Sequence, residues 1–451
     1  MAAFLSLVVI IIVARLILKG FRAEPVLLLA GLILMGATQL FGWGSVLPTG
    51  VASTGIEALD GFKVIRTLFS TRAADLGLMI MALMGFAKYM QFIGANDAVV
   101  ACAIKPLKHL HSPYILLFLS FIVANCLQLA IPSATGLGVL LMGTLFPVMV
   151  GLGISTASSA AVIVTSLCVA YAPTAVDAIR GSVAVQMDVV EYVIYHQGPA
   201  AVVTSLVIAF SHVFWQKHCD QKEGYSATIP DGKKQKKLSA PLFYALFPML
   251  PIIMAIASSS LFSDGIHLNI VTIVLVSITI TMIVELIRKR NLFTIMEDFK
   301  VFLNGMGTAF SNVVCLLVAA GVFAEGIKTS GTITELISMA QSVGLPAFAM
   351  SIVFAVITLL AALVMGSGNA PFLAFVELVP QIAQSMGSNA IAMILPMQQA
   401  SHMGRAISPV SGVMIAVSQG AELKPFDLVK RASVPVLIGF IFHCVIIGCF
   451  Y

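Results

Sequence analysis

Two short polar segments interrupt long apolar stretches, one in each half of the chain. They are Ser133-Ala-Thr-Gly-Leu-Gly138 and Gly366-Ser-Gly-Asn-Ala-Pro371. Small hydroxyl, amide and glycine residues break a helix and leave backbone groups unpaired, which lipid tolerates only where the break is buried in protein or lines a watery cavity. The matched pair of breaks therefore predicts a site for a small ligand inside a membrane protein.

Two breaks that contain proline follow the polar segments, at Ala172-Pro-Thr174 and at Ser408-Pro-Val-Ser-Gly412. Proline removes a backbone hydrogen bond and favours the start of a new half-helix. The free N–H groups at such a start carry partial positive charge, which suits an anion. Close packing between helices explains any single break equally well, but breaks at matched positions in both halves favour a binding site.

Ionisable residues lie beside the proline breaks, where an unpaired charge in the membrane costs kilocalories. The guanidinium of Arg405 can hold a carboxylate through two parallel hydrogen bonds. A salt bridge from Arg405 to Asp177 or Glu377, joining two helices, explains its presence equally well. Asp177 and His402 are candidates for proton coupling, with a hydrogen-bonded structural histidine as the competing interpretation of His402.

The composition places most of the chain in a bilayer. Of its 451 residues, 59% are hydrophobic and only 10% are charged, whereas ordinary globular domains have about 25% charged residues. The first apolar run, residues 2–18, is expected to be a retained helix rather than a secretory signal, because its basic residues follow it. Loop lysines and arginines account for the net charge of +5, so no nucleic-acid partner is expected. The seven cysteines lack metal-ligand spacing, and no metal or cofactor is predicted.

The two halves of the chain contain related sequence. Gly94 and Pro173 of the first half recur in the same order as Gly331 and Pro409 of the second half. Repeats with a broken helix in each copy are typical of secondary transporters, which bind their ligand near the bilayer midplane.

Loop charges indicate that the two copies have opposite orientations in the membrane. Residues 186–197 include acids but no lysine or arginine, whereas the corresponding residues 421–431 are rich in lysine and arginine. Because positively charged loops stay in the cytoplasm, the lysine-rich linker 216–240 is expected to be cytoplasmic and both termini external. The predicted organisation is N-terminal scaffold helices over 1–72, a first repeat over 73–215, the linker over 216–240, further scaffold helices over 241–300 and a second repeat over 301–451.

Three stretches of the chain resemble a known family. The stretches Asp75 to Val150, Val364 to Pro380 and Gln399 to Gly412 are similar to the anaerobic C4-dicarboxylate carriers of the DcuC type, within the wider ion transporter superfamily. The resemblance implies an all-helical polytopic protein with two inverted repeats, re-entrant helical hairpins, and separate scaffold and transport domains that work as an elevator. It also implies a homodimer in the bacterial inner membrane that exchanges succinate, fumarate, malate or aspartate.

The hairpin tips differ from those of the sodium-coupled relatives in that superfamily, which carry Ser-Asn-Thr at both tips. The matching residues here are Ser133-Ala-Thr135 in the first tip and Ser367-Gly-Asn369 in the second. Ala134 and Gly368 therefore lack the amides that help to bind substrate in those relatives, and sodium sites are not carried over. Proton coupling or plain exchange, with Asp177 and His402 as the titratable groups, becomes the preferred mechanism.

The predicted site is a pocket for a small dianion between the two hairpin tips and the two proline breaks. Arg405 is its possible counter-charge, and the other predicted contacts are Ser133, Ala134, Thr135, Gly136, Pro173, Thr174, Ser367, Gly368, Asn369, Pro409, Ser411 and Gly412. The alternative is a sodium- or proton-coupled symporter of another carboxylate. An intramembrane enzyme is a remote alternative, since the sequence has neither an HExxH nor a GxSxG motif.

Overall fold

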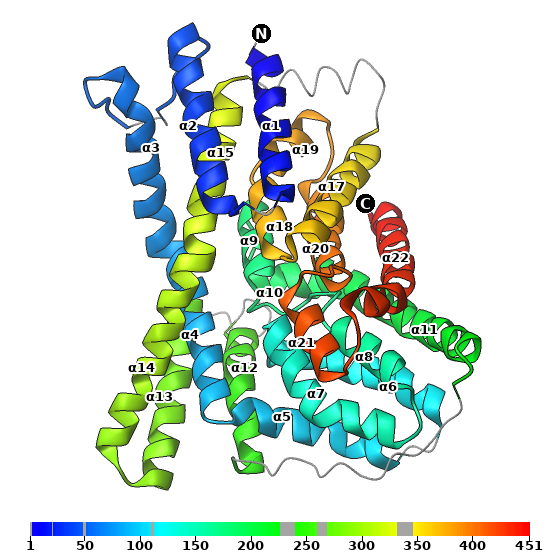
Figure 1. The fold of residues 1–451 in the computed structure, drawn as a ribbon. Helices are drawn as coiled ribbons and strands as arrows, with labels where there is room; N and C mark the ends of the chain where they lie inside the picture. The colour runs from blue at the N-terminus through cyan, green and yellow to red at the C-terminus, as the bar shows by residue number, and fades with distance from the viewer. Residues whose placement is uncertain are drawn as a thin grey trace.

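The computed structural model describes the fold of most of the chain (Figure 1). The described residues are 2–19, 21–47, 51–109, 112–225, 240–258, 268–331 and 346–451, and within them the regular structure is entirely helical. Residues 226–239 of the predicted linker lie outside them. The part of the linker before residue 223 belongs to the long helix α11 (Gly198–Lys222), in which Gln216 is fully buried.

The elements before residue 223 form the N-terminal part and the first repeat. They are α1 (Ala2–Leu18), α2 (Ala23–Phe41), α3 (Glu57–Arg72), α4 (Leu78–Phe92), α5 (Ala95–Ile104), α6 (Pro113–Cys126), α7 (Ala134–Gly151), α8 (Thr156–Val164), α9 (Val176–Ala184), α10 (Val189–Tyr192) and α11. A π-helical turn at Ala73–Gly77 makes α3 and α4 continuous. The predicted boundary at residue 72 therefore falls inside a continuous helical segment.

The elements after residue 239 include those predicted to complete the scaffold and to form the second repeat. They are α12 (Leu250–Ala257), α13 (Ile270–Lys289), α14 (Leu292–Ala309), α15 (Cys315–Thr329), α17 (Ala347–Met365), α18 (Asn369–Phe375), α19 (Val379–Ser385), α20 (Ala390–Ala406), α21 (Gly412–Gly420) and α22 (Pro425–Phe450). A π-helical turn at Phe310–Val314 likewise joins α14 to α15, and another at Val193–Gln197 joins α10 to α11. The predicted boundary at residue 300 likewise lies inside α14.

Backbone features recur in the two halves in the same order. Besides the π-helical turns at Ala73–Gly77 and Phe310–Val314, residues with left-handed backbone follow corresponding helices. These are Gly94, Gly153 and Gln186 in the first half and Gly331, Gly387 and Glu422 in the second. Because a non-glycine residue at positive φ is uncommon, the match between Gln186 and Glu422 supports a structural repeat.

The described helices include several that can cross a membrane. Seven are long and apolar enough, or eight if the bent pair α4 and α5 is one span. The chain bends by 73° between α4 and α5, at Gly94, which has a φ of 78°. The chain is thus a multi-pass membrane protein in which α4 turns sharply at one end.

The helices divide into two groups (Figure 1). Long helices stand on one side, at the left of the view: α2, α3, α4, α13, α14 and α15. Small residues let them approach closely; a Cβ at Gly305 of α14 would lie 2.8 Å from the Cα of Gly85 in α4. The short and broken helices α7, α8, α18, α20 and α21 gather on the other side.

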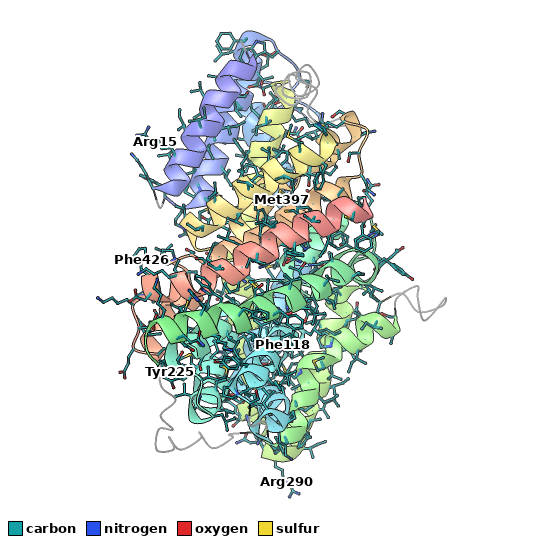
Figure 2. All side chains as sticks on the ribbon, turned by 90° about the vertical axis from the view of Figure 1, so that its right-hand side faces the viewer. Arg15, Phe118, Tyr225, Arg290, Met397 and Phe426 are labelled. Atoms are coloured by element: carbon teal, nitrogen blue, oxygen red, sulfur yellow. The ribbon has the colours of Figure 1, made fainter. Side chains whose placement is uncertain are left out.

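Two long helices cover the broken ones (Figure 2). α11 and α22 run side by side, joined by a 2.9 Å hydrogen bond between Thr204 and His443. Near one end of the pair, the buried Arg431 donates hydrogen bonds to Asp220 at 2.7 Å and to Glu223 at 2.6 Å. Paired in this way, the buried cation is tolerated.

Candidate functional site

A cavity of about 460 Å³ lies where the hairpin tips and the helix breaks meet. Most of the predicted contacts line it: Ser133, Ala134, Thr135, Gly136, Thr174, Asp177, Ser367, Gly368, Asn369, His402, Arg405 and Gly412. The structure therefore brings together residues that lie almost 280 positions apart in the sequence. Pro173, Pro409 and Ser411 do not line the cavity.

The first hairpin consists of α6 and α7, which meet at residues 130–133. α7 already begins at Ala134, so most of the polar segment 133–138 forms its first turns rather than a loop. Ser133 is the N-cap of this helix, and its Oγ accepts a hydrogen bond from the backbone N–H of Gly136 at 3.2 Å. The free N–H groups of a helix start thus border the cavity, as an anion site requires.

The second hairpin consists of α17, α18 and α19, and its tip packs against the second break. Gly366 ends α17 with a φ of 66°, and a Cβ there would lie only 2.9 Å from the carbonyl oxygen of Val410. Only glycine combines this backbone conformation with such a close approach. A Cβ at Gly412 would likewise lie 2.9 Å from Thr135 Oγ1, so both hairpins contact the same break.

The first break is longer than predicted, because residues 165–175 between α8 and α9 are unwound. Side-chain amides bind its backbone. Gln128 donates to the carbonyl of Val169 at 2.7 Å, and Gln197 donates to that of Ala170 at 2.8 Å. Gln399 accepts from the N–H of Ala170 at 2.9 Å. Buried backbone groups need such partners, so these amides make the unwound segment possible.

The amides are functional residues that sequence reasoning missed. Asn125, Gln128, Gln197, Gln398 and Gln399 are all at most 2% exposed. Each stands in or beside an apolar run, and a polar side chain there is expensive unless it has a partner. That signal could have identified them, but not the backbone groups that they bind.

The second break, residues 407–411, separates α20 from α21. Ser411 is the N-cap of α21, and its Oγ accepts from the N–H of Met414 at 3.3 Å. Ser411 is 1% exposed, so its hydroxyl is occupied by the helix and does not face the cavity. Both half-helices begin after their prolines, at Val176 and Gly412, rather than at them.

Asp177 and His402 form a buried polar cluster that joins α9 to α20. His402 Nε2 lies 3.0 Å from Asp177 Oδ2. Gln398 donates to the same carboxylate oxygen at 2.7 Å and accepts from the hydroxyl of Tyr192 at 2.8 Å. Among the described residues neither ring nitrogen of His402 makes a hydrogen bond, so Nε2 meets Asp177 only as an ion-pair contact, and a Cβ at Gly368 would lie 3.3 Å from Nδ1.

The guanidinium of Arg405 bridges the first break and the cavity. One terminal nitrogen donates to the carbonyl of Leu167 at 2.8 Å, and its Nε has no hydrogen-bond partner. Among the described residues it pairs with neither acid considered above. Asp177 is bound by Gln398 and His402, and Glu377 by arginines of other helices.

Glu377 is the centre of a separate ion cluster between the two groups of helices. It lies between α18 and α19 and pairs with Arg180 of α9 at 2.8 Å and with Arg72 at the end of α3. Arg72 also donates to the carbonyl of Leu317 in α15 at 2.9 Å. The cluster thus ties the second hairpin both to the first break and to the long helices.

Comparison with known proteins agrees with this architecture. Residues 1–450 match the family described as DcuC, C4-dicarboxylate anaerobic carrier. The chain is 44% identical over 437 residues to the anaerobic C4-dicarboxylate transporter DcuC of Escherichia coli K12, covering 97% of this chain and 94% of that protein. It is 41% identical over 449 residues to the probable anaerobic C4-dicarboxylate transporter DcuC of Vibrio cholerae, covering 98% and 96%.

Two solved structures share the fold. Neisseria gonorrhoeae MtrF, described as representing a class of antimetabolite efflux pumps, is similar with a TM-score of 0.57 at 13% identity, covering 94% of each chain. The Alcanivorax borkumensis YdaH transporter is similar with a TM-score of 0.59 at 14% identity, covering 95% of this chain and 98% of its own.

Proposed function

Because the chain belongs to the DcuC family of anaerobic C4-dicarboxylate carriers, we propose that it carries C4-dicarboxylates across the bacterial inner membrane. Succinate, fumarate, malate and aspartate are the proposed substrates. Exchange of one for another, or net export, is the proposed mode. The family and its curated relatives are transporters rather than enzymes.

One observation carries the proposal: a guanidinium borders the cavity without an acid partner. Arg405 retains unused N–H donors, and every described acid near it is bound elsewhere. A charge in this environment is expensive without a counter-ion. A substrate carboxylate would supply that counter-ion, and the planar guanidinium matches its geometry.

The polar groups around Arg405 suit a small dianion. Thr135 and Asn369, from the two hairpins, and Thr174, from the first break, offer hydrogen-bond donors to the same cavity. A cavity of about 460 Å³ lies within the usual range for small-molecule sites. It leaves room for water around a four-carbon substrate.

We assign proton coupling, where it occurs, to His402 and Asp177. His402 has one ring nitrogen near Asp177 and the other without a partner. A proton on Nδ1 would add a donor beside Gly368 at the second tip. Sodium coupling is disfavoured because Ala134 and Gly368 provide no side-chain oxygen at the tips.

We further propose an elevator movement in a homodimer. The long helices α2, α3, α4, α13, α14 and α15 would form the fixed scaffold. The hairpins and broken helices would move against it and carry the substrate away from α4. The small residues where α4 and α14 meet support a rigid scaffold.

The decisive test is counterflow of labelled succinate against internal fumarate in proteoliposomes. We expect uptake that depends on the internal dicarboxylate and persists without sodium. Strict sodium dependence would favour the symporter alternative. Absence of succinate uptake with retained transport of another carboxylate would reject the proposed substrate class.

A further inference from the structure

The cavity has a second wall, which α4 and the start of α5 provide. Met84, Ala87, Lys88 and Gln91 all line the cavity, and their spacing places them on one face of α4. Asn96 lines it from the first turn of α5, beyond the bend at Gly94.

Lys88 is a cation without a partner. None of the lysine ion pairs among the described residues involves it. Its stem is held in place, since a Cβ at Gly305 of α14 would lie 3.0 Å from the Cβ of Lys88. An ammonium in an apolar helix is retained where it meets water or an anion, and the cavity offers that place.

Asn96 is an unpartnered amide that lines the same cavity. It is 5% exposed, and within the described part of the chain its Oδ1 has no hydrogen-bond partner. A buried amide without a partner costs free energy. A ligand in the cavity would satisfy it, with the amide nitrogen donating to an acceptor.

The charges of the cavity lining require a second cation for a dianion. Among the described lining residues the charged side chains are Lys88, Asp177 and Arg405, with His402 titratable. Asp177 offsets one of the two cations. Without Lys88, and with His402 neutral, the lining would carry no net positive charge to meet two carboxylates.

We propose that Lys88, assisted by Asn96, binds the substrate carboxylate that Arg405 does not hold and thereby selects two-carboxylate over one-carboxylate substrates. This assignment rests on the proposed dicarboxylate transport. It gives the two carboxylates different partners: a guanidinium on the broken helix α20 and an ammonium on α4.

The test compares succinate with butyrate, which has the same number of carbons and one carboxylate fewer. Both are used as competitors of labelled succinate counterflow by the full-length protein. In Lys88→Gln we expect the inhibition constant of succinate to rise about tenfold or more while that of butyrate changes little. Lys88→Arg should retain most of the preference, and Asn96→Ala should reduce it in the same direction.

Lys300→Gln is the matched control. Lys300 is exposed on α14, pairs with Glu297 at 2.6 Å and does not line the cavity, so this variant should behave like the wild type. An unchanged ratio of the two inhibition constants in Lys88→Gln would overturn the proposal. Failure of the wild type to catalyse succinate counterflow would instead reject the proposed function.

If Lys88→Gln does not transport succinate, the melting temperatures measured with each ligand test the proposal instead. The wild type in detergent should melt at a higher temperature with succinate than with butyrate. Loss of this difference in Lys88→Gln and in Asn96→Ala supports the proposal. A difference that persists in both variants overturns it.

Discussion

At the scale of single residues, the site contains side chains that contact the protein through one polar group and leave another polar group without a partner. Arg405 lines the cavity and donates to the carbonyl of Leu167, while its Nε has no hydrogen-bond partner among the described residues. His402 lies against Asp177 and keeps Nδ1 without a partner. Such side chains are positioned by the protein before substrate arrives, which limits the entropy lost on binding.

Replacing Arg405 separates substrate binding from stability. Arg405→Gln should abolish succinate binding and lower stability by about 1 to 3 kcal/mol, because the carbonyl of Leu167 loses its charged donor. Arg405→Lys should restore binding only in part, since an ammonium lacks the planar fork. Melting curves with and without succinate measure both effects.

If Arg405 is instead a salt-bridge partner of Asp177, the stability of Arg405→Gln should respond differently to a second substitution. If Arg405 mainly neutralised Asp177, Asp177→Asn in the same chain would restore the lost stability. An Arg405→Gln protein that succinate still stabilises would contradict the binding role.

Alanine variants of the tip residues Ser133 and Asn369 should differ in their stability. Asn369→Ala should weaken the apparent affinity for succinate by about 1 kcal/mol, because one hydrogen bond to the substrate is lost. Its melting temperature should be unchanged. Ser133→Ala should also lower stability by about 1 kcal/mol, because Ser133 caps α7. Unchanged succinate affinity in both variants would place the site away from the tips.

Sequence reasoning located the cavity-lining residues better than their partners. Polar residues in apolar runs, such as Ser133 and Asn369, are visible by composition alone. The partner of Arg405 was undecidable from the sequence, because it depends on which helices face each other. Lys88 was missed for the same reason: the sequence of its helix does not show whether one face of that helix borders a cavity or another helix.

At the scale of elements, the hairpin tips and the second break form one packed unit. Gly366 contacts Val410, and Gly412 contacts Thr135. Neither contact leaves room for a side chain, so the two hairpins are held at fixed positions relative to α21.

Gly366→Ala should disrupt this unit, and Gly387→Ala is its control. Both glycines have a φ near 65°, but a Cβ at Gly387 meets nothing within 4 Å. Both variants should therefore lose about 1 kcal/mol of stability from backbone strain, and only Gly366→Ala should also lose succinate affinity. Equal affinities in the two variants would show that the packing of the tip does not shape the site. Counterflow and melting curves provide the comparison.

Element boundaries followed the sequence pattern only approximately. The prolines predicted half-helix starts at residues 173 and 409, whereas α9 and α21 start at Val176 and Gly412. α21 begins where Ser411 caps it, whereas no side chain caps α9. The backbone of the first break, over residues 166–171, is instead bound by four buried amides, those of Asn125, Gln128, Gln197 and Gln399. No local pattern predicts contacts over such sequence distances.

At the scale of the whole molecule, the repeat is the organising feature. Paired π-helical turns and paired left-handed residues appear in both halves. The order of helices was predictable because apolar runs and their interruptions set it. The opposite orientation of the two halves in the membrane stays a prediction from loop charge.

That orientation is tested by labelling single cysteines in a cysteine-free protein. Lys222→Cys, at the end of α11, should react only from the cytoplasmic side, and Tyr451→Cys only from outside. The expected difference follows from the lysines that continue after α11. Reaction of both from the same side would contradict the inverted arrangement.

In the proposed movement, the ion cluster around Glu377 would contribute to the energy barrier. Arg72 belongs to the long helices, whereas Glu377 and Arg180 belong to the parts that would move. Separating Arg72 from Glu377 would normally strand a buried carboxylate at a cost of several kilocalories. Arg180 would move together with Glu377, so the carboxylate would keep one partner. The activation enthalpy of exchange should therefore rise far more when Arg180 is removed than when Arg72 is removed, and the temperature dependence of counterflow would report this difference.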